Sequence, residues 1–216
     1  MRTLILFLAL AALPLAAQDN PDRWEEAMQA FEKADKANPP KKGGVVFYGS
    51  STIRRWDLKK SFPGKDYVNR GFGGSTTPEA TRYLDRVVLP LEPETIVVYE
   101  GDNDIGRGGT GPMVFVDFKK FVAKVHAKLP RTKIVFLAIK PSLARWHLVD
   151  QMRTANLMIE EYCYEDPRLI YVDTEAPMLG PGGEPRKELF VEDGLHMSDE
   201  GYAIWNKLVA PHLSNR

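Results

Sequence analysis

The sequence predicts an α/β fold, a three-layer sandwich in which helices cover both faces of a five-stranded parallel sheet. Five short apolar runs recur along the chain, and segments with helical spacing of apolar residues alternate with them. This alternation is typical of a parallel sheet built from strand–helix–strand units. Polar and glycine-rich residues follow the apolar runs, and in such folds the functional crevice lies beyond the carboxyl ends of the strands.

Residues 1–17 have the layout of a secretory signal peptide. Arg2 provides a positive start, the stretch 4–15 is almost continuously apolar, and small residues precede the polar Gln18. The apolar stretch is shorter than the ~20 residues that a helix needs to cross a bilayer. We therefore expect cleavage after Ala17 and a mature protein that is secreted or periplasmic, without stable insertion in the membrane.

Residues 18–42 are expected to form an N-terminal helix and a linker. Trp24, Met28 and Phe31 recur at helical spacing, which predicts an amphipathic helix over residues 21–36 that packs on the outside of the domain. The proline- and glycine-rich residues that follow end this helix and lead into the core. Residues 43–216 are predicted to form a single domain.

The five predicted strands are rich in β-branched and aromatic residues and cover residues 45–48, 67–69, 95–99, 133–138 and 169–172. The first, third and fourth are apolar on both faces, as a sheet buried by helices requires. Helical spacing connects the third strand to the fourth and the fourth to the fifth, at Phe115, Phe118, Val122 and Val125, and then at Leu148, Met152, Ala155, Ile159 and Tyr162. Ser198 is the expected N-cap of a final helix.

Composition excludes several classes of function. Lys plus Arg equals Asp plus Glu at 29 each, so the chain lacks the basic excess of a nucleic-acid binder. Cys163 is the only cysteine, so no internal disulfide can form. The phosphate-binding patterns G-x-x-x-x-G-K-[ST] and G-x-G-x-x-G are missing from the first strand–helix turn, and candidate metal ligands are too few. We expect no cofactor and no metal.

Four polar blocks come after strands or before the last helix, at residues 49–53, 69–76, 100–104 and 193–196. In this order they resemble the blocks of the SGNH hydrolase superfamily, also called GDSL-like lipases and esterases. The resemblance covers residues 45–208. It implies a flavodoxin-like α/β fold and a serine hydrolase that needs no cofactor.

Ser51 is the expected nucleophile. A serine at a strand–helix junction can equally be a helix N-cap, and its hydroxyl attacks poorly until a base removes the proton. The resemblance to the glycine-aspartate-serine pattern of the superfamily aligns Ser51 with the nucleophile. The same alignment puts Ser50 where the superfamily often has an aspartate.

His196 is the expected general base, with Asp193 as its acidic partner. The three-residue spacing in a turn lets the Asp193 carboxylate accept the Nδ1 proton, so that Nε2 faces the serine. Of the other three histidines, His126 lies within a predicted helix and His212 at the tail. His147, which follows the fourth strand, is the one rival.

Three hydrogen-bond donors are expected to stabilise an oxyanion. The resemblance assigns this role to the backbone N–H of Ser51, the backbone N–H of Gly74 and the side-chain amide of Asn103. From the residues alone, Gly74 and Asn103 could also be ordinary turn residues.

Arg107, Arg145 and Trp146 are candidate substrate-binding residues, because they follow the third and fourth strands on loops beside the expected crevice. No long apolar lid is evident, which favours short acyl groups, and acetyl esters of carbohydrates are the leading expectation. A lysophospholipase or thioesterase, a non-catalytic carbohydrate-binding module on the same fold, and a flavodoxin-like cofactor protein are the alternatives. The oligomeric state is left open.

Overall fold

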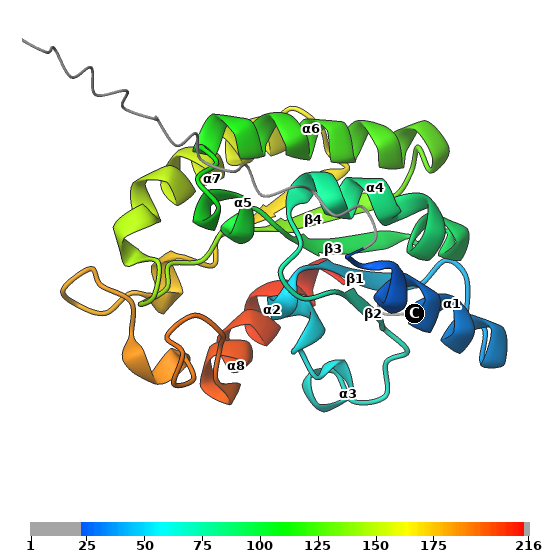
Figure 1. Ribbon diagram of the computed structural model, residues 1–216, viewed down its shortest axis with the longest axis horizontal. Coiled ribbons are helices and arrows are strands. Elements are labelled where there is room, and N and C mark those ends of the chain that lie inside the picture. The colour runs from blue at the N-terminus through cyan, green and yellow to red at the C-terminus, as the bar shows by residue number, and fades with distance from the viewer. Residues whose placement is uncertain (1–22, 214–216) are drawn as a thin grey trace, which may run out of the picture.

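The computed structural model describes residues 23–213, so the predicted signal peptide lies outside the described residues. One sheet forms the middle layer (Figure 1) and its five strands are all parallel, in the order β2-β1-β3-β4-β5. The predicted strands are confirmed, with small shifts at their ends: β1 (Val45–Gly49), β2 (Val68–Gly71), β3 (Thr95–Tyr99), β4 (Lys133–Leu137) and β5 (Leu169–Val172).

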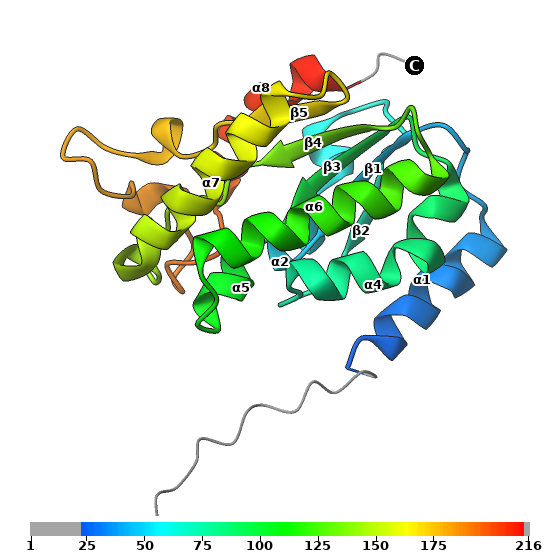
Figure 2. The ribbon, with the colours of Figure 1, turned by 90° about the horizontal axis from the view of Figure 1, so that it is seen from above.

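Four helices cover one face of the sheet (Figures 1 and 2): α1 (Glu25–Ala37), α4 (Thr77–Val87), α6 (Gly111–Lys128) and α7 (Val149–Tyr164). Alternate strand residues point to this side, because successive side chains of a strand face opposite ways. Tyr48, Val98 and Phe136 are among them, and they pack against helix residues such as Phe118 and Ile159 in one buried cluster.

The other face is covered by α2 (Ser51–Arg54), α3 (Leu58–Ser61) and α8 (Asp199–Val209) (Figure 1). The intervening strand residues, including Phe47 and Tyr99, form a second buried cluster with two tryptophans, Trp56 and Trp205. Two hydrogen bonds join α8 to the region of α2. Tyr202 donates to the Thr52 carbonyl at 2.8 Å, and the Trp56 indole donates to the Asn206 side chain at 2.9 Å.

The predicted helices are present, and the last of them begins at its expected cap. Ser198 caps α8 by accepting from the Gly201 N–H. Helix α4 is not among the predicted helices, although its start carries a capping box, in which Thr76 and Glu79 satisfy each other's backbone N–H. A one-turn helix, α5 (Asp102–Gly106), follows β3. Helix α6 begins at Gly111, shortly after α5.

Helix α1 packs on the domain through its apolar face. Met28 is completely buried, and the Trp24 ring lies edge-on to Phe72 with 5.4 Å between centroids. Arg86 of α4 pairs with Glu25 and Glu32 of α1 at 2.6 and 2.8 Å. Half-exposed ion pairs contribute little, so apolar burial holds most of this contact.

The register of the sheet brings three strand ends to one level. Gly49 pairs with Gly71 of β2 on one side and with Tyr99 of β3 on the other. A Cβ at Gly49 would lie 2.1 Å from the Tyr99 carbonyl oxygen, so only glycine lets the chain leave β1 at this point. The segments that follow β1, β2 and β3 therefore start side by side.

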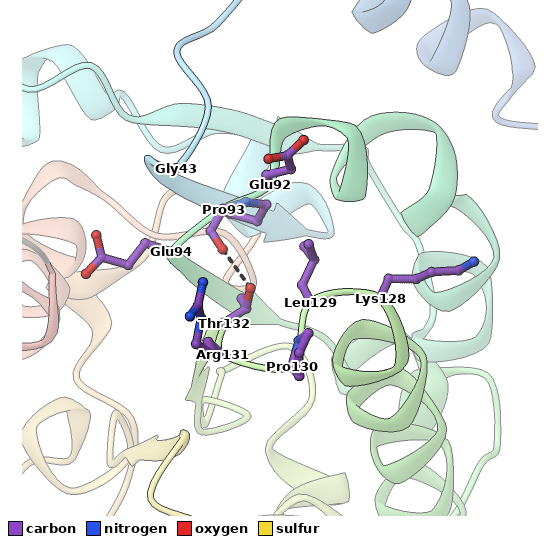
Figure 3. A pocket seen from close by; sticks show the side chains of 9 residues that line it. All are labelled: Gly43, Glu92, Pro93, Glu94, Lys128, Leu129, Pro130, Arg131 and Thr132. Atoms are coloured by element: carbon purple, nitrogen blue, oxygen red, sulfur yellow. Dashed lines mark hydrogen bonds between the residues drawn. The ribbon is translucent and has the colours of Figure 1, made fainter.

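The opposite edge of the sheet carries a cavity of about 760 Å³, shown in Figure 3. Its lining comes from segments that precede β1, β3 and β4, including Gly43, Glu94 and Thr132, whose hydroxyl donates to the Pro93 carbonyl at 2.7 Å. None of the four polar blocks lines it. Within residues 23–213 no helix is long and apolar enough to cross a membrane.

Candidate active site

Ser51, His196 and Asp193 form a continuous hydrogen-bonded chain. The His196 Nε2 atom lies 2.8 Å from the Ser51 Oγ, and its Nδ1 lies 2.6 Å from Asp193 Oδ2. An ionised carboxylate only accepts hydrogen bonds, so Nδ1 carries the proton and Nε2 is free to accept from the serine. Burial pushes the pKa of Asp193 upward, but hydrogen bonds from the His196 ring and from two backbone N–H groups outweigh it and hold that pKa well below its usual range.

A short loop fixes the acid and the histidine relative to each other. Asp193 Oδ1 accepts from the backbone N–H of Leu195 and of His196, at 2.9 and 2.8 Å. The His196 carbonyl accepts from the Val191 N–H at 2.9 Å, and the Gly194 carbonyl accepts from the Ala144 N–H at 3.0 Å. The loop is thus tied to itself and to the segment after β4, so the imidazole has little freedom to turn.

His147, the alternative candidate for the base, does not contact Ser51. His147 is exposed on a single turn of 3-10 helix, Trp146–Leu148. His126 lies 3.0 Å from the Thr132 carbonyl, through its Nε2 atom. Among the described histidines, His196 is the one that touches Ser51.

The three predicted oxyanion donors lie on the adjoining segments that follow β1, β2 and β3. Ser51 is the first residue of α2, where a backbone N–H has no partner within the helix. Gly74 has φ +78°, which a residue with a side chain rarely adopts. The Asn103 amide donates one hydrogen to the Ser75 carbonyl at 2.9 Å, which leaves its second N–H available.

The two predicted substrate-binding arginines have internal partners. Arg145 binds the Asn103 Oδ1 atom with both terminal nitrogens, each at 3.2 Å. Arg107 donates to the Gly74 carbonyl at 2.6 Å. Both guanidinium groups therefore position the loops that carry the expected oxyanion donors, a role that the sequence did not indicate. Trp146 is half-buried, with the Arg153 guanidinium 5.5 Å from its ring centroid.

A buried ionic cluster contacts Asn103 through Arg145. Asp102 pairs with Lys140 at 3.0 Å and with Arg145 at 2.6 Å, and Lys140 is completely buried. Burial alone would raise the pKa of Asp102, but the charges of Lys140 and Arg145 reverse this effect and lower it. The residue before Asn103 is thus anchored as a carboxylate between two cations.

A second buried carboxyl group supports the Gly74 side. The Ser75 hydroxyl lies 2.6 Å from Glu100 Oε1 and 3.2 Å from the Phe72 carbonyl oxygen, and it can donate to either. A hydroxyl has one proton, so Ser75 can donate to Phe72 only while it accepts from a protonated Glu100. Burial, reinforced by the nearby Asp104 charge, raises the pKa of Glu100 well above its usual value, which favours the protonated acid.

Asp104, the residue after Asn103, braces the loop. Both of its carboxylate oxygens accept from the Thr77 N–H, at 3.0 and 3.2 Å, which ties the start of α4 to α5. Burial raises the pKa of Asp104 to about 6, against the opposing effect of this hydrogen bond.

Sequence reasoning missed Glu100, Asp102 and Lys140 as site residues. One signal was available: each follows a fully apolar strand with at most two residues between, at the edge where the site was expected. Across the described residues, no three His, Cys, Asp or Glu side chains gather as a metal site would need.

Comparisons with known proteins identify the family and the fold. The sequence profile of the GDSL-like Lipase/Acylhydrolase family matches residues 44–204. No curated protein matches the chain. A solved structure from Streptococcus pneumonia, described as a platelet activating factor, has a TM-score of 0.80 at 21% identity, covering 89% of this chain and 94% of that one. A GDSL-like lipase from Bacteroides thetaiotaomicron has a TM-score of 0.71 at 21% identity, covering 89% and 96%. An acetyl esterase variant determined with acetate has a TM-score of 0.61 at 15% identity, covering 78% and 94%.

Proposed function

Because the chain belongs to the GDSL-like Lipase/Acylhydrolase family, we propose that it is an exported serine esterase that cleaves carboxylic esters through an acyl-enzyme. The hydrogen-bonded chain from Asp193 through His196 to Ser51 carries the proposal. In it, Ser51 is the nucleophile, His196 the general base and Asp193 the group that orients the imidazole.

The reaction follows from the positions of these atoms. Ser51 Oγ attacks the ester carbonyl while His196 Nε2 takes the hydroxyl proton, which it then gives to the leaving alcohol. The developing oxyanion is stabilised by the N–H groups of Ser51 and Gly74 and by the free N–H of Asn103. Water, activated by His196, then attacks the acyl-serine and releases the acid.

The surroundings of the site favour a short acyl group. Asp193 keeps 43% of its side chain exposed, and His196 keeps 14%, so the site is open to solvent. Beside them, Leu143 and Val191 are isolated exposed apolar side chains, at 40% and 41%. Such small apolar contacts suit an acetyl group better than a long chain. We therefore propose acetyl esters, with a carbohydrate as the alcohol component.

Export is part of the proposal and rests on the sequence of residues 1–17. Cleavage after Ala17 would leave five residues before the start of the described chain at Arg23. The one cysteine, Cys163, is buried, and burial raises its pKa to about 12, so it is protected from oxidation in an oxidising compartment. Mass spectrometry of the exported protein would give the position of the cleavage site.

Replacement of the nucleophile is the direct test of the proposed function. We expect Ser51→Ala to lower the kcat for p-nitrophenyl acetate by on the order of 10⁵-fold, because the acyl-enzyme can no longer form. Ser50→Ala is the matched control, since Ser50 precedes the nucleophile, is buried and makes no side-chain capping bond. Equal turnover by Ser51→Ala and the wild type would contradict the assignment.

A series of p-nitrophenyl esters with acyl chains of increasing length would test the acyl preference. We expect kcat/KM to be highest for the acetyl ester. A maximum at long chains would instead favour a lysophospholipase-type activity on the same residues.

A further inference from the structure

We propose that Arg23, Arg54 and Arg107 form an anion-binding surface beside Gly74, which selects ester substrates that carry a carboxylate or phosphate near the ester. The proposal rests on the proposed esterase function, because it places this surface next to the expected oxyanion site. It assigns the class of substrate, which the family alone does not give.

Arg54 lies one helical turn after the nucleophile, on α2. Its guanidinium carbon is 2.8 Å from the point that a Cβ of Gly73 would occupy. The glycine thus provides the space in which this guanidinium lies against the turn. The backbone of Arg54 is equally constrained, because its N atom is 2.1 Å from the Cβ position of Gly71. Arg54 is therefore held at the turn by two glycines.

Arg23 and Arg107 approach the same turn from other parts of the chain. The Arg23 side chain, just before α1, places its Nη2 atom 3.2 Å from the Cβ position of Gly74, and its Cζ lies 4.4 Å from the Trp24 ring centroid. Arg107, after α5, donates to the Gly74 carbonyl at 2.6 Å. Three guanidinium groups from distant segments thus surround two consecutive glycines.

The positive charge at this turn is poorly compensated. Among the described residues, no carboxylate lies within ion-pair distance of Arg23 or Arg54, and the Glu79 partner of Arg107 is 3.5 Å away and also caps α4. Some other arginines are paired, as Arg168 is with Asp166. The whole chain has 29 cationic and 29 anionic residues, so no overall positive charge accounts for this cluster.

Guanidinium groups bind planar carboxylates and phosphates through paired N–H donors. A cluster of them in an open site also attracts anions before contact, and this attraction weakens as salt is added, with a Debye length of about 10 Å at 0.1 M. A substrate with its anionic group at this turn would hold its ester carbonyl next to the N–H of Gly74. The arrangement therefore predicts discrimination by charge and a dependence on ionic strength.

The test compares 4-acetoxybenzoate with its methyl ester, which differ mainly in one negative charge. We expect the wild type to prefer the anionic ester in kcat/KM by about tenfold, with the preference declining between 20 and 500 mM NaCl. In the double variant Arg23→Gln/Arg54→Gln the ratio of the two kcat/KM values should fall by about tenfold, through KM. 4-Acetoxyphenyl phosphate, run in parallel, shows whether carboxylate or phosphate is preferred.

Arg131→Gln is the matched control, since Arg131 is an exposed arginine at the opposite edge of the sheet (Figure 3). It should leave the ratio unchanged. Equal kcat/KM for the two esters in the wild type, or an unchanged ratio in the double variant, would overturn the proposal. Calorimetric binding of both esters to the Ser51→Ala protein keeps this test separate from catalysis. Tighter binding of the anionic ester that is lost with Arg23 and Arg54 supports the anion site even if no ester is cleaved.

Discussion

Glu100 and Asp102 lie two residues apart after β3 and are equally buried, with 2% and 4% of their surfaces exposed. Their pKa values nevertheless move in opposite directions. Glu100 has the Ser75 hydroxyl as its partner and an acidic neighbour, Asp104. Asp102 has two cations, Lys140 and Arg145. At equal burial, the charge of the neighbours decides in which direction the pKa of the carboxyl group moves.

The difference has a consequence for the chemistry proposed here. An uncompensated carboxylate next to the oxyanion site would oppose the negative charge that develops in the transition state. Burial raises the pKa of Glu100, which favours its neutral form, and the charge of Asp102 lies between two cations. Each carboxyl group can thus support a donor loop, through Ser75 and Asn103 respectively, without weakening the donors.

The largest effect on the free energy of unfolding is expected when Lys140, an ionic partner of Asp102, is removed. We predict that Lys140→Met lowers the free energy of unfolding by about 3–5 kcal/mol, because Asp102 keeps a buried charge with only Arg145 left to compensate it. Urea denaturation, with the m-value as a check on two-state behaviour, measures the loss. Adding Asp102→Asn should restore part of it. A loss below about 1 kcal/mol would mean that Lys140 contributes little to compensating the buried charge of Asp102.

The next largest effect, a loss of kcat, is expected at Arg145, which joins the ionic cluster to Asn103. We predict that Arg145→Lys lowers kcat for p-nitrophenyl acetate by about 10- to 100-fold, since it keeps a cation near Asp102 but loses the paired contact with Asn103 Oδ1. KM should change much less, and the free energy of unfolding should drop by roughly 1 kcal/mol. Steady-state kinetics beside urea denaturation separates the two. A loss confined to stability would refute a positioning role for Arg145.

The smallest effect on stability is expected at Glu100. We predict that Glu100→Gln changes the free energy of unfolding at pH 5 by no more than about 1 kcal/mol, because the amide can donate to Ser75 as the neutral acid does. Asp102→Asn, the same exchange two residues away, should cost several times more. Equal losses in the two variants would contradict the assignment of opposite charge states.

The pH dependence of the same Glu100→Gln variant tests the neutral state of the acid. A raised pKa means that the folded protein holds more protons than the unfolded chain above pH ~4.5, so stability from Glu100 is present at low pH and is lost as pH rises. The Gln side chain does not titrate, so the stability of the variant lacks this dependence on pH. Its stability relative to the wild type should therefore increase from pH 5 to pH 8 in urea denaturation, and parallel curves would count against a protonated Glu100.

The sequence was sufficient where the signal is local. The five strands could be predicted from apolar runs, and Asp193 with His196 from a spacing that fits one turn. It was insufficient where partners are distant. Arg145 contacts Asn103 across 42 residues, and nothing in its own neighbourhood shows that it will turn inward. Arg23 approaches Gly74 only because α1 packs against α4 and Phe72. Such pairings depend on tertiary packing, which local patterns do not encode.

The Ser51 hydroxyl and its base are separated by 145 residues, and α8, near the end of the chain, is fastened to the segment that begins with Ser51. A polypeptide that stops before residue 190 would present this serine at the end of β1 with nothing to withdraw its proton. Under the proposed mechanism, hydrolysis would therefore begin only when the last segment of the chain has docked against α2.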